Sequence, residues 1–394
     1  MKNHESTKKF FKIKKNELCG FVTELQGKHW WQLFPVSRGK YPFVIEIPEG
    51  ITAIKENAFT GLKAGINGSI LVKIPTGVTR IEKNAFSGCE INKLFISDTV
   101  TYIDPDAFRL SKIGEIEVDK ANLEFKSEAG SLYNYDLTAI LRYAGEDSDY
   151  TVLNTVTTIG KRAFENTSKL ECIYIPDNVT VIADGAFYNS AVKSISGAAF
   201  VTALGQHVFA LCRNLRSFMM PNGVTNVNHR RFYCCDALES ITLSQSTAQI
   251  GEEAFYLCTS LREIELPNDV KSIGKGAFEG CRALRTVKLP ERLTSIGERT
   301  FKGCASFSDP TINDSIISIG KEAFSGCNRM KKIVIGVGVT SIGEHAFLGC
   351  SKNLQVVLKG RKKEEKLPFD KKWKNISSGS IIKKKIKNIA YLSV

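Results

Sequence analysis

The sequence lacks the features on which membrane spans and most catalytic sites depend. None of its 394 residues lies in an apolar run near the ~20 residues that a membrane helix requires. It contains no G-x-S-x-G nucleophile elbow, no H-E-x-x-H zinc motif and no G-x-x-x-x-G-K-S/T phosphate loop. We therefore expect no transmembrane segment, no catalytic residues, no cofactor and no enzymatic activity.

Histidine is scarce, and the one local group of metal-ligand residue types is incomplete. The chain has five histidines, and only His229 lies close in sequence to two cysteines, Cys234 and Cys235. Structural zinc sites use four ligands, usually in paired spacings. This group lacks a fourth ligand and the paired spacing, so we expect no metal site.

Phenylalanine, by contrast, recurs at a fixed spacing. Of the eleven intervals between twelve such residues, seven are 23 residues long and two are 22. A period of this size is typical of stacked supersecondary units, none of which can bury its own apolar face alone. The sequence therefore predicts a solenoid with a continuous aromatic core at Phe59, Phe86, Phe108, Phe164, Phe187, Phe209, Phe232, Phe255, Phe278, Phe301, Phe324 and Phe347.

One unit, which begins at Leu261, shows how a repeat is built. Ile264 and Leu266 share one side of a short extended segment, which Pro267 ends because proline cannot donate to a strand ladder. The repeat phenylalanine, Phe278, then fills the centre. Full burial of such a ring is worth roughly 1.5–3 kcal/mol, most of which the ordering of the coil offsets.

Cysteine follows the same period. Eight of the eleven cysteines lie three residues after a repeat phenylalanine, so they form a column. Neighbouring members are about 4.8 Å apart, which a disulfide could span, yet a small buried residue in each turn explains the spacing equally well. We expect reduced, buried thiols at Cys89, Cys212, Cys235, Cys258, Cys281, Cys304, Cys327 and Cys350.

The two linked patterns, Leu-x-x-Ile-x-Leu-Pro and Ile-Gly-x-x-Ala-Phe-x-x-Cys, resemble the BspA-like leucine-rich repeat family, also called the Treponema pallidum type. The resemblance covers roughly residues 43–358. It implies a β-rich leucine-rich-repeat solenoid of about 12 repeats with short parallel strands. It also implies protein interaction or adhesion, often at a cell surface, without catalysis.

The first thirty residues are polar and basic, without the apolar centre of a signal peptide. As the sequence stands, we expect a cytoplasmic protein. Because members of the family usually carry export signals, the resemblance implies the alternative, a cell-surface or secreted protein.

The repeat pattern divides the chain into three parts. We expect an N-terminal cap over residues 1–42, the solenoid over 43–358 and a basic C-terminal cap or tail over 359–394. The long interval between Phe108 and Phe164 indicates an inserted β-hairpin at about residues 115–150, with a turn from Asn134 to Thr138.

The repeat departs from its own pattern in the centre. The glycine two residues after the phenylalanine is replaced in three consecutive units, and aromatic and basic residues lie beside it: Leu211, Cys234, Leu257, Tyr233, Tyr256, Arg230 and Arg231. Exposed apolar area rimmed by charge is typical of partner sites, although ordinary packing between coils would also explain these residues. A third interpretation, a redox-responsive role for Cys234, requires a lowered thiol pKa.

A second candidate surface is the outward row of the predicted sheet, where leucine-rich repeats generally recognise partners. Its chemistry is mixed, with no row of aromatic rings for sugars and no single sign of charge. A protein ligand therefore fits better than a polysaccharide. The row contains Tyr174, Met219, Thr242, Glu265, Lys288, Thr311 and Val334.

The net charge of +13 is concentrated at the ends of the chain. Residues 355–394 carry 12 basic and 3 acidic groups, whereas the repeat array carries 33 of each. A nucleic-acid groove would need basic residues on one face of the repeats, so we expect no nucleic-acid partner. The alternative function is binding of anionic polymers or surfaces through the C-terminal segment, although a solvated tail beyond the last repeat also explains its charge.

Overall fold

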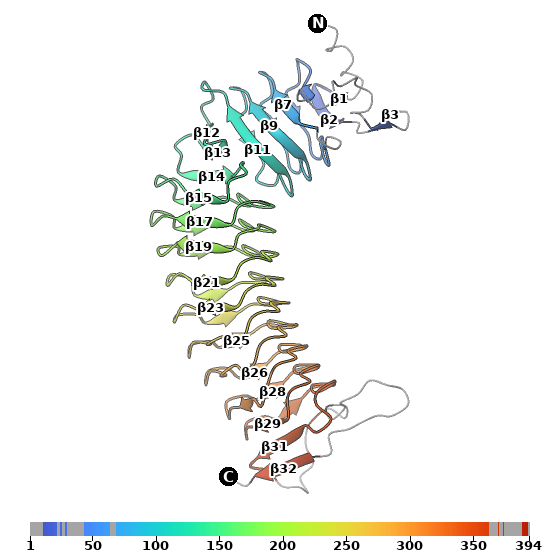
Figure 1. Ribbon diagram of the computed structural model, residues 1–394, viewed down its shortest axis with the longest axis vertical. Helices are drawn as coiled ribbons and strands as arrows, with labels where there is room; N and C mark the ends of the chain where they lie inside the picture. The colour runs from blue at the N-terminus through green and yellow to red at the C-terminus, as the bar shows by residue number, and fades with distance from the viewer. Residues whose placement is uncertain are drawn as a thin grey trace. The chain divides into compact units, whose positions relative to one another are not determined.

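A computed structural model describes residues 11–21, 24–25, 28–29, 43–63, 68–361, 369, 373 and 388–392. All regular elements among these residues are β-strands, and most are short (Figure 1). The chain forms two compact units. The first contains residues 1–170 and 181–187, and the second contains residues 171–180 and 188–394.

Each coil of the first unit contributes to two parallel ladders. The longer strands form a four-stranded sheet in the order β11-β9-β7-β5; they are β5 (Phe43–Glu46), β7 (Ile70–Ile74), β9 (Glu90–Ile96) and β11 (Lys112–Val118). Two-residue strands form the second ladder; they are β6 (Ala53–Ile54), β8 (Arg80–Ile81) and β10 (Tyr102–Ile103).

An antiparallel hairpin begins the first unit. It joins β1 (Phe11–Lys14) to β2 (Glu17–Phe21), and β2 then pairs in parallel with β6. The ring of Phe21 lies 5.6 Å from that of Phe59, so an aromatic side chain covers the first repeat phenylalanine. A separate two-stranded pair is formed by β3 (Glu24–Leu25) and β4 (Lys28–His29).

The inserted segment forms two consecutive hairpins rather than the single one expected. Its antiparallel strands are β12 (Phe125–Glu128), β13 (Ser131–Asn134) and β14 (Ala139–Arg142). The turn from Asn134 to Thr138 forms where the sequence places it, with the Asn134 amide donating to the Thr138 hydroxyl at 2.8 Å. The additional turn occupies Ala129 and Gly130, both with positive φ, a conformation that suits a two-residue hairpin loop.

Parallel pairing resumes directly after the insertion. β14 pairs with β16 (Thr158–Ile159), which pairs with β18 (Val181–Ile182), and β15 (Asp149–Thr151) lies between β14 and β16 in the chain. Tyr143 stacks on Phe164 with ring centroids 5.3 Å apart, so a tyrosine occupies the place of a repeat phenylalanine.

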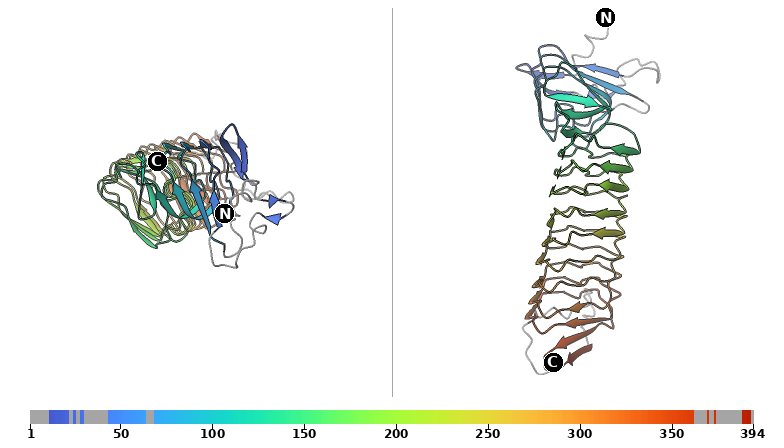
Figure 2. Two further views of the ribbon diagram at one scale, coloured as in Figure 1. Left: turned by 90° about the horizontal axis from the view of Figure 1, so that it is seen from above. Right: turned by 90° about the vertical axis from the view of Figure 1, so that its left-hand side faces the viewer.

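The second unit repeats the two-ladder arrangement (Figure 2). Its wider face contains β17 (Cys172–Ile175), β19 (Ser194–Gly197), β21 (Ser217–Met219), β23 (Ser240–Thr242), β27 (Thr311–Ile312), β29 (Lys332–Ile335), β31 (Gln355–Lys359) and β32 (Asn388–Leu392). Its two-residue strands are β20 (Ala203–Leu204), β22 (Asn226–Val227), β24 (Gln249–Ile250), β25 (Ser272–Ile273), β26 (Ser295–Ile296), β28 (Ser318–Ile319) and β30 (Ser341–Ile342).

The repeat phenylalanines form the core, as the period predicts. All twelve are at most 5% exposed. In the second unit the rings of Phe232 and Phe255 lie 5.4 Å apart and are parallel within 1°. Each coil therefore completes its core with the ring of the next coil, which is why no single coil is stable alone.

The cysteine column also lies inside, and it contributes hydrogen bonds. The thiol of Cys235 donates to the carbonyl of Phe209 in the preceding coil at 3.1 Å, and Cys258 does the same to Phe232. All eight column thiols are buried. Burial raises the pKa of Cys212 to about 12, so this thiol is far from the thiolate form that reacts or binds metal.

The C-terminal segment is more than the solvated tail considered as one alternative. β32 pairs in parallel with β31 over five residues, and Trp373 lies with its ring 6.1 Å from that of Phe347. Trp373 is 3% exposed, so it covers the last repeat phenylalanine. Most basic residues of this segment lie outside the described residues.

Candidate functional site

The residues that depart from the repeat in the second unit, Leu211, Arg230, Arg231, Tyr233, Cys234, Tyr256 and Leu257, are called the central stripe. Three of them lie at a strained corner of the coil. Leu211, Cys234 and Leu257 all have positive φ, at 64°, 55° and 56°. A bulky residue is rare in this left-handed region because its Cβ crowds the backbone. Sequence reasoning overlooked three further residues at the same corner, all with positive φ: Leu110, Asn166 and Asn189.

The aromatic members of the stripe lie side by side. The rings of Tyr233 and Tyr256 stack at 4.9 Å with an angle of 7° between them. The guanidinium of Arg230 lies 5.2 Å from the centre of the Tyr233 ring and 2.6 Å from the carboxylate of Glu253. The hydrogen bond with Glu253 raises the pKa of Arg230. Both tyrosines are half-buried, so the stripe presents one broad aromatic face.

Two residues assigned to the stripe are buried instead. Arg231 is fully buried, and its guanidinium donates to the backbone carbonyls of Leu204, Gly205 and Asn226. It ties two coils together and cannot contact a partner. Cys234 is 7% exposed, and burial raises the pKa of its thiol, which opposes the lowered pKa that a redox role requires.

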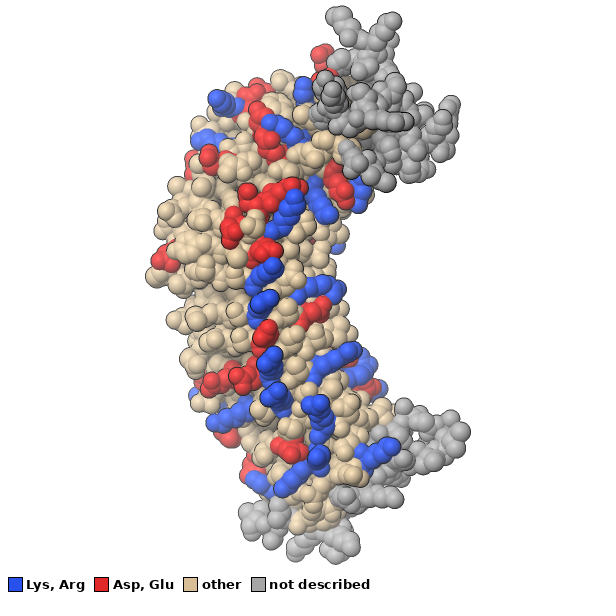
Figure 3. Space-filling view, in the orientation of Figure 1, with Lys and Arg blue, Asp and Glu red and all other residues tan. Residues whose placement is uncertain are grey.

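Most of the outward row of the sheet is exposed, and Val334 is half-buried. Met219 is 74% exposed and Tyr174 is 45% exposed, and Glu265 and Lys288 are exposed as well. Basic and acidic side chains are interspersed over the face of the molecule seen in Figure 3.

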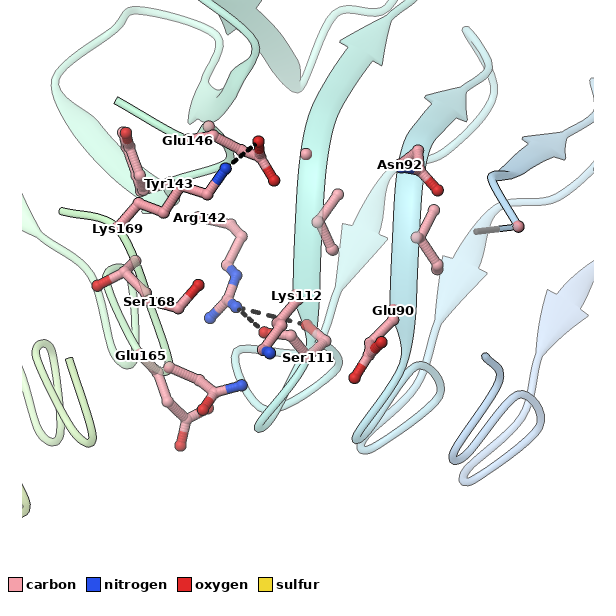
Figure 4. A pocket seen from close by; sticks show the side chains of 17 residues that line it. Glu90, Asn92, Ser111, Lys112, Arg142, Tyr143, Glu146, Glu165, Ser168 and Lys169 are labelled. Atoms are coloured by element: carbon pink, nitrogen blue, oxygen red, sulfur yellow. Dashed lines mark hydrogen bonds and ion pairs between the residues drawn. The ribbon is translucent and has the colours of Figure 1, made fainter. Parts of the chain in front are cut away.

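A cavity of about 490 Å³ lies in the first unit, beside the insertion (Figure 4). Its walls come from the starts of β9 and β11, the end of β14 and the coil at residues 165–169. Its size is within the range of small-molecule sites. Sequence reasoning did not find it, because its residues are far apart in the chain and belong to no motif.

Arg142 lies at the centre of the cavity wall. Its Nη2 donates to the Ser111 carbonyl at 2.7 Å, and its Nη1 donates to the Arg162 carbonyl at 3.1 Å. Its Nε has no partner among the described residues. Burial lowers the pKa of Arg142 to about 10, while the nearby Glu165 opposes this shift.

Within the described ranges, no three His, Cys, Asp or Glu side chains gather closely enough to hold a metal ion. Nor does the described part of the chain contain a helix that could cross a membrane.

The repeat pattern and the fold agree with a known family. The family described as BspA type leucine rich repeat region matches residues 44–141, 143–262 and 248–365. The chain belongs to the BspA-type leucine-rich repeat family. A comparison with curated proteins finds no match.

Solved leucine-rich repeat proteins resemble this BspA-type chain in part. One from Bacteroides ovatus is 22% identical, with 93% of this chain and 88% of that one aligned and a TM-score of 0.49. One from Eubacterium ventriosum is 21% identical over 72% of this chain and 82% of that one, with a TM-score of 0.48. The Treponema pallidum leucine-rich repeat protein is 24% identical over 60% and 90%, with a TM-score of 0.35.

Proposed function

We propose that this BspA-type chain is a non-enzymatic recognition module that binds a protein partner through the central stripe. The residues of the stripe that a partner can reach are Leu211, Arg230, Tyr233, Tyr256 and Leu257, because Arg231 and Cys234 are buried. The observation that carries the proposal is the left-handed corner. Regular coils place glycine there, whereas these coils hold leucine in a conformation that costs of order 1 kcal/mol.

The composition of the stripe supports a protein partner over a sugar or a nucleic acid. Tyrosine and arginine are the residues most often found at the energetic centre of protein interfaces. The stacked pair Tyr233–Tyr256 is rigid, so little side-chain entropy is lost on binding. The charge of Arg230 is already paired with Glu253, which leaves no excess of positive charge for a polyanion.

The exposed row at Tyr174 and Met219 supplies a second contact surface in the same unit. Met219 is a large apolar side chain left mostly in water, and methionine adapts to varied partners. This row is the secondary candidate, because the side chains along it differ in chemistry.

Photo-crosslinking tests the central proposal. A photo-reactive phenylalanine at position 256 is expected to capture a discrete protein from an extract of the source cells. The same group at Tyr102, an exposed tyrosine of the first unit, serves as the matched control. Capture must be lost in the Tyr233→Ser/Leu257→Ser variant and kept in the Tyr102→Ser/Leu110→Ser variant. Equal capture by both variants would show that the stripe is only structural.

Salt separates this function from polyanion binding by the basic C-terminal segment. Polyanion binding falls steeply between low and physiological salt, whereas capture through an aromatic stripe should change little. Deleting the segment would be a poor test, because Trp373 covers Phe347. Replacing Lys383, Lys384, Lys385 and Lys387 with Gln removes four of the twelve basic groups of this segment and leaves Trp373 unchanged.

A further inference from the structure

The charged side chains that line the cavity beside the insertion are three basic and three acidic ones, but they do not all pair with one another. Each of its carboxylates has a basic partner of its own: Glu90 with Lys63 at 3.0 Å, Glu146 with Lys169 at 2.6 Å, and Glu165 with Arg162. Arg142 and Lys112 have no ion pair among the described residues, although both line the cavity. Two cationic side chains are therefore left without an ion-pair contact in the described ranges, although Glu165 lies near enough to Arg142 to raise its pKa, against the lowering that burial causes.

Arg142 is the more unusual of the two, because it is 3% exposed. A buried charge is costly unless it is paired or fully hydrogen-bonded. Backbone carbonyls accept from its two terminal nitrogens, yet its Nε donor is unsatisfied. An anion in the cavity would offset the charge of the guanidinium.

The remaining lining is polar and suits an organic ligand better than a bare ion. Around the guanidinium, Figure 4 shows Ser168 and Glu165 on one side and Ser111 and Lys112 on the other. The hydroxyl of Ser111 donates to the Phe108 carbonyl at 2.6 Å and accepts from Nη2 of Arg142 at 3.4 Å, so it helps to hold the guanidinium in place. A volume of about 490 Å³ is far larger than a single inorganic anion needs.

The two sides of the cavity are held by separate elements. Glu165 is fully buried and accepts from the backbone amide of Leu110 at 2.8 Å. This contact joins the coil at 165–169 to the coil before β11, and Arg142 spans the same gap by bonding to Ser111 and Arg162. The cavity is therefore formed in advance, which reduces the ordering cost of binding.

We propose that this cavity binds a small organic carboxylate, with the carboxylate group between Arg142 and Lys112 and its polar body against the serine and threonine hydroxyls. Arginine matches a carboxylate with parallel N–H donors. The carboxylate could belong to a sugar acid or to the end of an amino acid or peptide. This site is separate from the stripe and does not depend on the proposed protein partner.

Calorimetric titration of the full chain tests the proposal. Glucuronate and N-acetylalanine are the two carboxylate probes, and glucose and N-acetylalanine amide are their neutral counterparts. We expect at least one carboxylate to bind at least about tenfold more tightly than its neutral counterpart. The probe that binds identifies the source of the carboxylate. No binding of either carboxylate at 10 mM, roughly the weak end of ligand affinities, overturns the proposal.

Variants locate the binding. Lys112 is exposed, so Lys112→Gln should fold normally and weaken carboxylate binding about fivefold. Arg142→Gln should weaken it at least about thirtyfold, and Arg142→Lys should restore part of the loss. Lys83→Gln, an exposed lysine of the same unit outside the cavity, is the control. An equal loss in Lys83→Gln and Lys112→Gln, or equal binding of the neutral probes, would exclude the site.

Discussion

Two buried arginines, one in each unit, serve different purposes. Arg231 is enclosed, and three backbone carbonyls, from its own coil and the preceding one, accept from its guanidinium. Arg142 is almost as deeply buried, yet its Nε is unsatisfied and it borders a cavity. Burial lowers the pKa of both to about 10.

The difference shows that burial alone does not tell a structural arginine from a binding one. What separates them is whether the protein itself supplies every acceptor. At Arg231 the regular stacking of coils brings carbonyls to all three nitrogens. At Arg142 the insertion interrupts the stacking, so the surrounding coils leave the Nε donor without an acceptor in the described part of the chain and leave a cavity beside the side chain.

The largest expected effect is that of Arg231→Met. Removing the guanidinium leaves the carbonyls of Leu204, Gly205 and Asn226 without this donor in a closed interior. We expect the free energy of unfolding to fall by about 3 kcal/mol, measured by urea denaturation. A loss below about 1 kcal/mol would mean that Arg231 is not a structural tie.

Arg142→Met should cost less, about 1–2 kcal/mol, because only two carbonyls lose a donor and the cavity lets water reach them. The same urea series measures it. Saturating carboxylate probe should raise the melting temperature of the wild type and leave that of Arg142→Met unchanged. If Arg142→Met is the more destabilising of the two arginine variants, the contrast between them fails.

Alkaline pH should destabilise the thiol column of the second unit. Burial raises the pKa of Cys212 from its ordinary value of 9 to about 12 in the folded protein. Its stabilising contribution is complete below pH 9 and is lost as the pH rises towards 12. Raising the pH from 8 to 10 should therefore lower the free energy of unfolding by about 1 kcal/mol through this thiol. The urea midpoints of wild type and Cys212→Ala, measured at both pH values, isolate the contribution of this thiol. An equal loss of stability in the two proteins would contradict the prediction.

The smallest expected effect is an increase in stability. Leu257→Gly relieves the left-handed corner of the stripe and should stabilise the fold by about 0.5–1 kcal/mol. Thermal unfolding measures the gain. Leu110→Gly, at the same corner of the first unit, should stabilise similarly without affecting photo-crosslinking from position 256. A destabilised Leu257→Gly variant would mean that the leucine is held by packing rather than by function.

The contrast between the two arginines also explains which features could be predicted. The spacing of the phenylalanines predicts the coils, and that of the cysteines predicts the buried column, because both recur by local rules in every unit. Arg231 follows directly before a repeat phenylalanine, where regular coils hold a small residue, and this could have indicated burial. The stripe was found by the same comparison of units.

The cavity left only faint traces in the sequence. Ser111 and Thr167 occupy the column position that most other coils fill with cysteine, and both line the cavity. Tyr143 occupies the place of a repeat phenylalanine within the long interval. None of these three substitutions indicates a site by itself.

The sequence alone determined the coil, its dry aromatic interior and the places where the pattern changes, because a repeat contacts only its immediate neighbours and each contact recurs. The tertiary structure decided which polar groups found partners. Arg142, Lys112 and Glu165 come together because an inserted pair of hairpins separates two coils. Non-local placement of this kind is set by packing, not by spacing along the chain.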